Sequence, residues 1–147
     1  MFGQLRETRG VVAEELAVRR AAERQAVGRN QQAIADLRDA EAIVGKTIIR
    51  HGNERLKQEF LPKILHAEIE FAIGYSEPEA GTDLANLRTS AVRDGDDYVV
   101  NGQKMWTSLI QYADYIWLAV RTNTEAKKHR GISVLIVPTD VEGFSWT

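Results

Sequence analysis

Residues 88–100 read RTSAVRDGDDYVV, and this stretch decides the fold class of the later part of the chain. Two runs that contain β-branched or aromatic residues lie on either side of the dipeptide Asp94–Gly95. An Asp-Gly pair between two such runs favours a tight turn, because glycine adopts the positive φ angles that such turns require. The stretch therefore predicts a β-hairpin.

Further strand-like runs lie on both sides of this hairpin. They are EIEFAIGYS at 68–76, DYIWLAVRT at 114–122 and GISVLIVPT at 131–139, and FSWT at 144–147 is a candidate for the start of another strand. The Asn-Gly pair at 101–102 is either a second turn or a kink within one strand. Short strands joined by polar turns predict a small antiparallel β-barrel or sandwich at residues 67–147.

Residues 1–66 have a different character. Ala, Arg, Glu and Gln dominate them and aromatic residues are few, which favours helix. In the segment HGNERLKQEFLPKIL (51–65), Asn53 is a good N-cap and Pro62 is expected to end the helix. Gly45 is the expected end of the helix before it. The chain is therefore predicted to be α+β, with a partial N-terminal helical domain at 1–66 followed by the β-domain.

The composition is that of an ordinary globular protein, with 147 residues of which 44% are hydrophobic and 27% charged. A net charge of -2 gives no electrostatic argument for binding nucleic acid or an anionic membrane. The chain has no cysteine, which excludes disulfides and thiol catalysis and fits a cytoplasmic enzyme. The longest apolar run, 115–120, is far too short to span a bilayer, and MFGQLRETRG (1–10) carries charges where a signal peptide is apolar. We expect a soluble, cytoplasmic protein.

The common catalytic templates do not occur in the sequence. It contains no G-x-S-x-G elbow, no Walker loop and no G-x-G-x-x-G fingerprint. The histidines, which lack the spacing of metal ligands, are His51, His66 and His129. The acidic residues Glu77, Glu79 and Asp83 do not match a calcium loop, and capping of their own loop is the better interpretation. No metal site is predicted.

Two other stretches are dense in chemically active side chains. GYSEPEAGTDLANL (74–87) combines hydroxyls and carboxylates with Gly and Pro, and NGQKMWTS (101–108) places a Trp before two hydroxyl residues. Such an indole can pack against a flat aromatic ligand while the hydroxyls hydrogen-bond the polar edge of that ligand. Taken alone, the second stretch is better explained by a core Trp106 with hydroxyls that cap a turn.

Together, and in this order, the two stretches resemble the acyl-CoA dehydrogenase family. ADYIWLAVRT (113–122) and GISVLIVP (131–138) continue the resemblance, and HGNERLKQEFLPKIL is similar to the helix that leads into the middle domain of that family. The resemblance covers residues 44–147. EFAIGYSEPEAGTDL and ADYIWLAVRT are most similar to the actinobacterial branch that acts on CoA esters of steroid side chains, whose members often work as heteromeric pairs.

The resemblance implies a flavin between the two stretches and a thioester beside the first. It places the Ser76 hydroxyl at the pyrimidine side of the isoalloxazine, Ser108 near the reactive N5 and Trp106 against the ring system. The implied FAD-binding set is Ile73, Tyr75, Ser76, Trp106, Thr107 and Ser108. The implied acyl-CoA-binding set is Gly81 and Thr82. The chain departs from the family pattern at Glu79, where Gly is preferred, and at Thr107, where an apolar residue is common.

The implied reaction is α,β-dehydrogenation of an acyl-CoA, in which a base removes the α-proton while flavin N5 takes hydride from the β-carbon. The base of the family is a glutamate of a C-terminal helical bundle. We expect that bundle to be absent here, so no catalytic residue is assigned. We expect a homo- or hetero-oligomer to supply it, and we expect little activity from a chain truncated at both ends.

Two other functions stay open on the sequence. In the first, the chain is a non-catalytic remnant or a partner module of a heteromeric acyl-CoA dehydrogenase. In the second, it is an unrelated flavin- or nucleotide-binding barrel, which keeps Trp106 and the hydroxyls as ligand contacts but has no thioester site.

Overall fold

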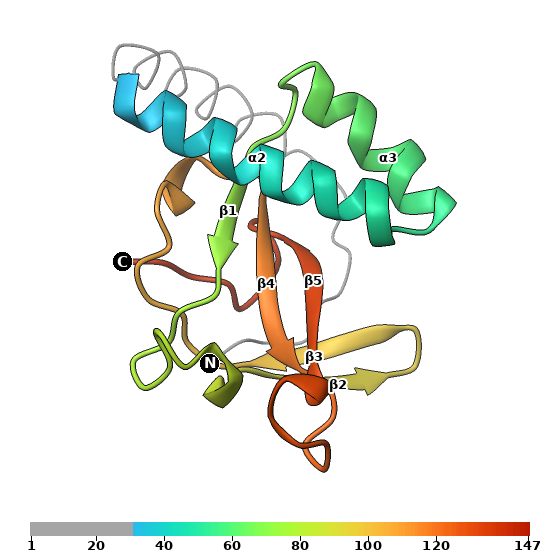
Figure 1. Ribbon diagram of the computed structural model, residues 1–147, viewed down its shortest axis with the longest axis vertical. Helices are drawn as coiled ribbons and strands as arrows, with labels where there is room; N and C mark the ends of the chain where they lie inside the picture. The colour runs from blue at the N-terminus through green and yellow to red at the C-terminus, as the bar shows by residue number, and fades with distance from the viewer. Residues whose placement is uncertain (1–30) are drawn as a thin grey trace. The chain divides into compact units, whose positions relative to one another are not determined.

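The structure, a computed structural model, describes residues 31–147 (Figure 1). The helical character expected for residues 1–30 lies outside the described residues. The α-helices are α2 (Gln31–His51) and α3 (Glu54–Leu65). The strands are β1 (Phe71–Gly74), β2 (Ser90–Asp94), β3 (Asp97–Asn101), β4 (Tyr115–Arg121) and β5 (Ile132–Pro138). Short 3-10 helices in the loops are η1 (Leu84–Asn86), η2 (Ile110–Tyr112) and η3 (Lys128–Gly131). The predicted α+β order is confirmed.

The described strands form a mixed five-stranded sheet with the order β1-β4-β2-β3, and β5 also pairs with β4. The expected antiparallel arrangement is wrong at one place, because β2 runs parallel to β4 where Ser90 lies opposite Arg121. The sheet does not close into a barrel, since β1, β3 and β5 each pair with a single strand. β4 has the most partners, and its residues from Ile116 to Val120 are all buried.

The predicted hairpin is confirmed as the antiparallel pair β2–β3, whose register runs from Ser90 opposite Asn101 to Asp94 opposite Asp97. The turn itself consists of Gly95 and Asp96. Gly95 has a φ of 62°, which a residue with a Cβ adopts only with strain. Asp94 belongs to the strand, so the glycine occupies the first position of the turn and not the second.

The start of α3 is also as predicted, because the Asn53 side chain accepts a hydrogen bond of 2.9 Å from the backbone N–H of Leu56. Two predicted helix ends are wrong. Pro62 lies inside the last turn of α3, where its missing N–H costs the helix a single bond. Gly45 lies inside α2, which continues to His51, and a Cβ there would lie 3.7 Å from Cγ2 of Ile64, an ordinary van der Waals distance.

The sixth strand considered for residues 144–147 does not form, because the chain turns directly after β5. The backbone N–H of Phe144 donates to the carbonyl of Val141 at 3.2 Å, and Gly143 in this turn has a φ of 82°. The turn takes the last residues out of line with β5. The other strand-like runs all contain a strand.

The described chain divides into two compact units. One unit contains Ile73–Ser108 and Ile116–Thr147, and the other contains residues 31–72 and Leu109–Tyr115. The boundary between a helical domain and a β-domain at residue 66 remains a prediction. No helix within residues 31–147 is long and apolar enough to cross a membrane.

An aromatic cluster forms the centre of the unit that contains α3. The ring centroids of Phe60 and Tyr115 lie 5.3 Å apart at an interplanar angle of 85°, an edge-to-face contact. The ring centroid of Phe71 lies 6.1 Å from that of Phe60 and 5.6 Å from that of Tyr115. Phe60 is 5% exposed and Phe71 is 1% exposed, so the cluster joins α3 to segments that follow it in the sequence through buried apolar surface.

We predict that Phe60→Ala destabilises the protein by about 3–5 kcal/mol, because it removes a buried ring and leaves a cavity between two other aromatic rings. Urea unfolding followed by circular dichroism measures this loss. Leu65→Ala is the matched control on the same helix, since Leu65 is 82% exposed, and we expect it to change stability by less than about 0.5 kcal/mol. Equal effects of the two substitutions would show that the cluster does not stabilise the fold.

Candidate functional site

The structure brings the two chemically dense stretches together. The backbone N–H of Met105 donates to the carbonyl of Ser76 at 2.8 Å. One residue earlier, Lys104 Nζ donates to the carbonyl of Tyr75 at 3.1 Å. These two bonds join the segment that follows β3 to the loop that follows β1. Residues 73–76 and 106–108, which the sequence assigned to one ligand, therefore come from adjacent segments.

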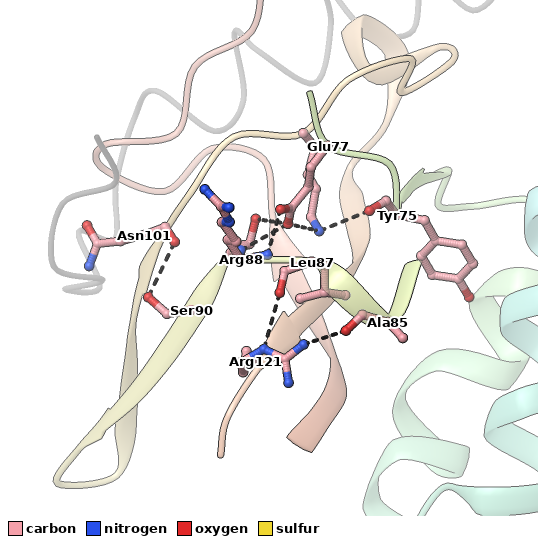
Figure 2. A network of polar contacts seen from close by, with 10 residues as sticks. Tyr75, Glu77, Ala85, Leu87, Arg88, Ser90, Asn101 and Arg121 are labelled. Carbon is pink, nitrogen blue, oxygen red and sulfur yellow. Dashed lines mark hydrogen bonds and ion pairs between the residues drawn. The ribbon is translucent and has the colours of Figure 1, made fainter. Parts of the chain in front are cut away.

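The carboxylate of Glu77 is the most heavily bonded group in this region, and Figure 2 shows the network around it. Oε2 accepts from the backbone N–H of Arg88 at 2.6 Å. Oε1 accepts from the backbone N–H of Thr89 at 2.9 Å, from the Thr89 hydroxyl at 2.6 Å and from Lys104 Nζ at 2.8 Å. Glu77 is buried, so these donors replace the water that a carboxylate otherwise requires. The interpretation of Glu77 as a capping residue is confirmed.

These donors also set the protonation of Glu77. Burial alone would raise the pKa of the carboxyl group. The hydrogen bonds from Lys104, from the Thr89 hydroxyl and from the two backbone amides outweigh burial and lower the pKa from 4.5 to about 2. Burial lowers the pKa of Lys104, and the ion pair with Glu77 opposes that shift. Glu77 is therefore ionised at neutral pH.

Gly102 explains how the segment leaves the sheet. A Cβ at this position would lie 2.6 Å from Cα of Thr89, which is closer than real Cβ atoms approach. The absence of a side chain lets the chain pass directly over Thr89, a residue that is 1% exposed. β3 ends at Asn101, so the Asn-Gly pair is the point where the strand stops and the segment toward Lys104 begins.

Arg121 fixes the other end of the first stretch. Its guanidinium donates to the carbonyls of Ala85 at 2.8 Å, of Leu87 at 3.2 Å and of Lys128 at 3.0 Å (Figure 2 shows the first two). Arg121 ends β4, and its bonds tie η1 to η3. No sequence pattern indicates this role, because the three carbonyl groups belong to the backbone and leave no pattern of side chains.

The positions of the residues assigned to a ligand can now be described. Trp106 is 84% exposed, so its interpretation as a core residue is wrong. Its backbone has a φ of 57°, uncommon for a residue with a side chain. Ser108 is exposed and Ser76 is half-buried. Thr107 Oγ1 is buried and has no hydrogen-bond partner among the described residues.

The other assigned residues lie on the first stretch. The Tyr75 hydroxyl accepts a hydrogen bond of 3.1 Å from Nε1 of Trp117, so it satisfies the polar atom of a buried residue. Ile73, in β1, is half-buried. Gly81 and Thr82 are exposed on the loop before η1, and a Cβ on Gly81 would meet no described atom within 4 Å.

The remaining acidic residues of the first stretch have partners within it or directly after it. Glu79 pairs with Arg88 at 2.6 Å on the surface, and Asp83 accepts from the Asn86 side chain at 2.9 Å. Within residues 31–147 no group of three or more His, Asp or Glu side chains is placed to hold a metal ion.

Comparison with known proteins decides the family. The model of the acyl-CoA dehydrogenase middle domain matches residues 72–147, just over half of the chain. The chain belongs to the acyl-CoA dehydrogenase family. The resemblance noted in the sequence is confirmed, and the alternative of an unrelated flavin- or nucleotide-binding barrel is wrong.

Individual members of the family show how close the similarity is. The chain is 74% identical to the acyl-CoA dehydrogenase FadE26 of Mycobacterium tuberculosis (strain ATCC 25618 / H37Rv) over 107 residues, which is 71% of this chain and 27% of that protein. The solved Tcur3481–Tcur3483 steroid ACAD is 60% identical with a TM-score of 0.70, over 71% of this chain and 27% of that one. A glutaryl-CoA dehydrogenase from Mycobacterium smegmatis in complex with FADH2 is 35% identical with a TM-score of 0.57. This match covers 66% of this chain and 24% of that one. This acyl-CoA dehydrogenase chain thus spans about a quarter of the length of these relatives.

Four residues that the sequence did not assign to the site hold its segments in place. They are Glu77, Thr89, Lys104 and Arg121. No local pattern marks Lys104, which directly follows the polar residue Gln103. Its partner is 27 positions away, at a separation that no helix or strand period connects.

We predict that Glu77→Gln flattens the acid dependence of stability. Because the folded pKa of about 2 lies below the ordinary value of 4.5, ionised Glu77 stabilises the folded state above pH 4.5, and this contribution is lost as the pH falls toward 2. The shift corresponds to roughly 3 kcal/mol at neutral pH. Urea unfolding of both proteins at several pH values measures it. The free energies of unfolding should differ most near pH 7 and converge near pH 2, and a difference independent of pH would contradict the assignment.

Proposed function

We propose that this chain forms the flavin-binding and thioester-binding part of an FAD-dependent acyl-CoA dehydrogenase. The observation that carries the proposal is the junction of the two stretches by the Met105–Ser76 and Lys104–Tyr75 hydrogen bonds, with Trp106 left exposed beside it. FAD supplies the N5 atom that accepts hydride from the β-carbon of the substrate.

The side chains of this region have the chemistry that a flavin requires. The exposed indole of Trp106 offers a flat apolar face, and Ser76 and Ser108 offer hydroxyl groups at either side of the junction. The buried Thr107 Oγ1, without a partner among the described residues, is a donor that a ligand could satisfy. A ligand with a flat ring and several polar edge atoms would use all of these groups, which supports FAD.

The proposed roles follow from these positions and from the family. Ser76 would donate to the pyrimidine side of the isoalloxazine, Ser108 would donate near N5, and Trp106 would cover the ring. Ile73, Tyr75 and Thr107 would complete the flavin site. Hydrogen bonds to the ring tune its electron affinity, and the indole excludes water from it.

The thioester would lie along the exposed loop that carries Gly81 and Thr82. Gly81 has free space around its Cα, so a ligand can approach its backbone closely. Arg121, through the carbonyls of Ala85 and Leu87, holds the far end of this loop in place. The similarity to the Tcur3481–Tcur3483 steroid ACAD favours a CoA ester of a steroid side chain as the substrate.

The proposal includes a partner and a cellular location. Because the chain spans about a quarter of its relatives, the base that removes the α-proton and further FAD contacts would come from a helical bundle outside the described residues. The proposed assembly is a homo- or hetero-oligomer, which the two-chain Tcur3481–Tcur3483 relative favours. The cytoplasm is the proposed location, with neither nucleic acid nor membrane as a partner.

The same two-chain relative also favours a second function, that of a non-catalytic partner module in a heteromeric acyl-CoA dehydrogenase. Flavin binding distinguishes the two functions. A chain that binds FAD near 1:1, read from its visible absorbance spectrum, holds the cofactor. A chain that binds no FAD at high added concentration is a module of the second kind.

We predict that Trp106→Ala weakens FAD binding by about two- to tenfold, because it removes an aromatic contact with the isoalloxazine. Titration of the purified chain with FAD, followed by flavin absorbance and fluorescence, measures the dissociation constant. Trp146→Ala is the matched control, since Trp146 is also exposed (56%) but lies outside both stretches. An equal effect of the two substitutions would show that Trp106 is not part of the flavin site.

We also predict that the chain alone, saturated with FAD, shows little or no turnover of an acyl-CoA with an artificial electron acceptor. No glutamate of the described residues is assigned as the base, and proton removal is required for the reaction. The rate is compared with that of FAD and substrate without protein. Turnover clearly above this background would show that the chain contains its own base.

A further inference from the structure

Glu77 and Lys104 form a buried ion pair. Lys104 Nζ lies 2.8 Å from Glu77 Oε1, and the side chains are 5% and 6% exposed. The other ion pair of this loop, Glu79–Arg88, has exposed fractions of 66% and 78% for its two side chains. An exposed pair contributes little to stability, whereas removing one partner of a buried pair leaves an uncompensated charge.

The location of the pair makes it relevant to the site. Lys104 lies directly before Met105, whose N–H bonds to the Ser76 carbonyl, and two residues before Trp106. Glu77 directly follows Ser76. Glu77 is therefore next in sequence to Ser76, and Lys104 is two residues from Trp106. Both Ser76 and Trp106 are proposed to contact the flavin.

The segment after Lys104 also needs external support. Trp106 and Leu109 have φ angles of 57° and 60°, and residues with side chains keep such angles only where their surroundings hold them. Trp106 is exposed and gains little support from packing of its own side chain. The hydrogen bonds made by Lys104 and Met105 attach this segment to the first stretch.

Glu77 also connects this segment to the loop that carries Gly81 and Thr82. Its carboxylate accepts from the backbone amides of Arg88 and Thr89, which close the loop that carries Gly81 and Thr82. Its own backbone also exchanges hydrogen bonds of 2.9 and 3.2 Å with Ala80. One carboxylate thus holds the ends of this loop and, through Lys104, the segment that carries Trp106.

We propose that Glu77 and Lys104 are a positioning pair that fixes the segment 105–108 against residues 74–77, and thereby fixes the flavin contacts of Trp106 and Ser108. This inference rests on the proposed function for its flavin readout. Neither side chain is assigned a contact with the cofactor or with the reacting atoms. The pair acts through the backbone that it holds.

Lys104→Met is the first test, because it removes the charge and keeps much of the volume of the side chain. We expect the Met105 amide to exchange its hydrogen about tenfold faster or more, while the amides of β2 and β3 keep their protection. We expect the dissociation constant for FAD to rise by about tenfold. Hydrogen exchange read by NMR and titration with FAD measure the two effects.

Two further variants complete the test. Glu79→Gln is the matched control, because it removes the exposed ion pair of the same loop, and we expect neither effect from it. The double variant Glu77→Gln with Lys104→Met leaves no buried charge unpaired, so we expect it to fold even where Lys104→Met alone does not. It should still show fast exchange at Met105 and weakened FAD binding.

The two readouts separate the two proposals. If the wild-type chain binds no FAD, the proposed function fails, and exchange at Met105 still tests the positioning pair. If the double variant keeps wild-type protection at Met105, the pair does not position the segment and the inference is overturned. Fast exchange at Met105 with unchanged FAD affinity would also overturn it, because the segment would then not govern the flavin site.

Discussion

A buried carboxylate cannot stay ionised without donors, and the carboxylate of Glu77 imposes this requirement on the whole site. Two backbone amides, a hydroxyl and an ammonium group meet it, and they come from separate parts of the chain. Each donor must be held at hydrogen-bonding distance, so the loop after β1, the start of β2 and the segment after β3 are fixed relative to one another. The charge thus organises loops that have no helix or sheet of their own to do so.

The same requirement explains two residues that look unrelated to it. Thr89 is almost fully buried because both its N–H and its hydroxyl serve Glu77. Gly102 has no side chain because the chain crosses directly over Thr89 on its way to Lys104. A larger residue at 102 would push the crossing segment away, and Lys104 Nζ would then lie beyond hydrogen-bonding distance of the Glu77 carboxylate. Packing and electrostatics therefore act on the same few positions.

The sequence predicted those features whose cause is local. The β2–β3 hairpin depends on Gly95 and the start of α3 on Asn53, and each signal acts within a few residues. The end of α2 could not be read in this way, because the helix continues through Gly45 to His51. The parallel contact between Ser90 and Arg121, and the pairing of Glu77 with Lys104, join distant positions and leave no periodic pattern. The residues proposed to contact flavin and thioester were named from family resemblance, and the groups that hold them in place required the structure.

A comparison of two tryptophans shows why the exposed one supports a ligand site. Trp117 is 6% exposed, lies in β4 and donates its Nε1–H to Tyr75, so both its apolar surface and its polar atom are satisfied within the chain. Trp106 is 84% exposed, and its backbone has a φ of 57°, which is unfavourable for a residue with a side chain. Both features of Trp106 are unfavourable for folding, since an indole gains from burial and a positive φ costs energy. A side chain held in this way, beside Thr107 and Ser108, supports the proposed contact of Trp106 with a flat ligand.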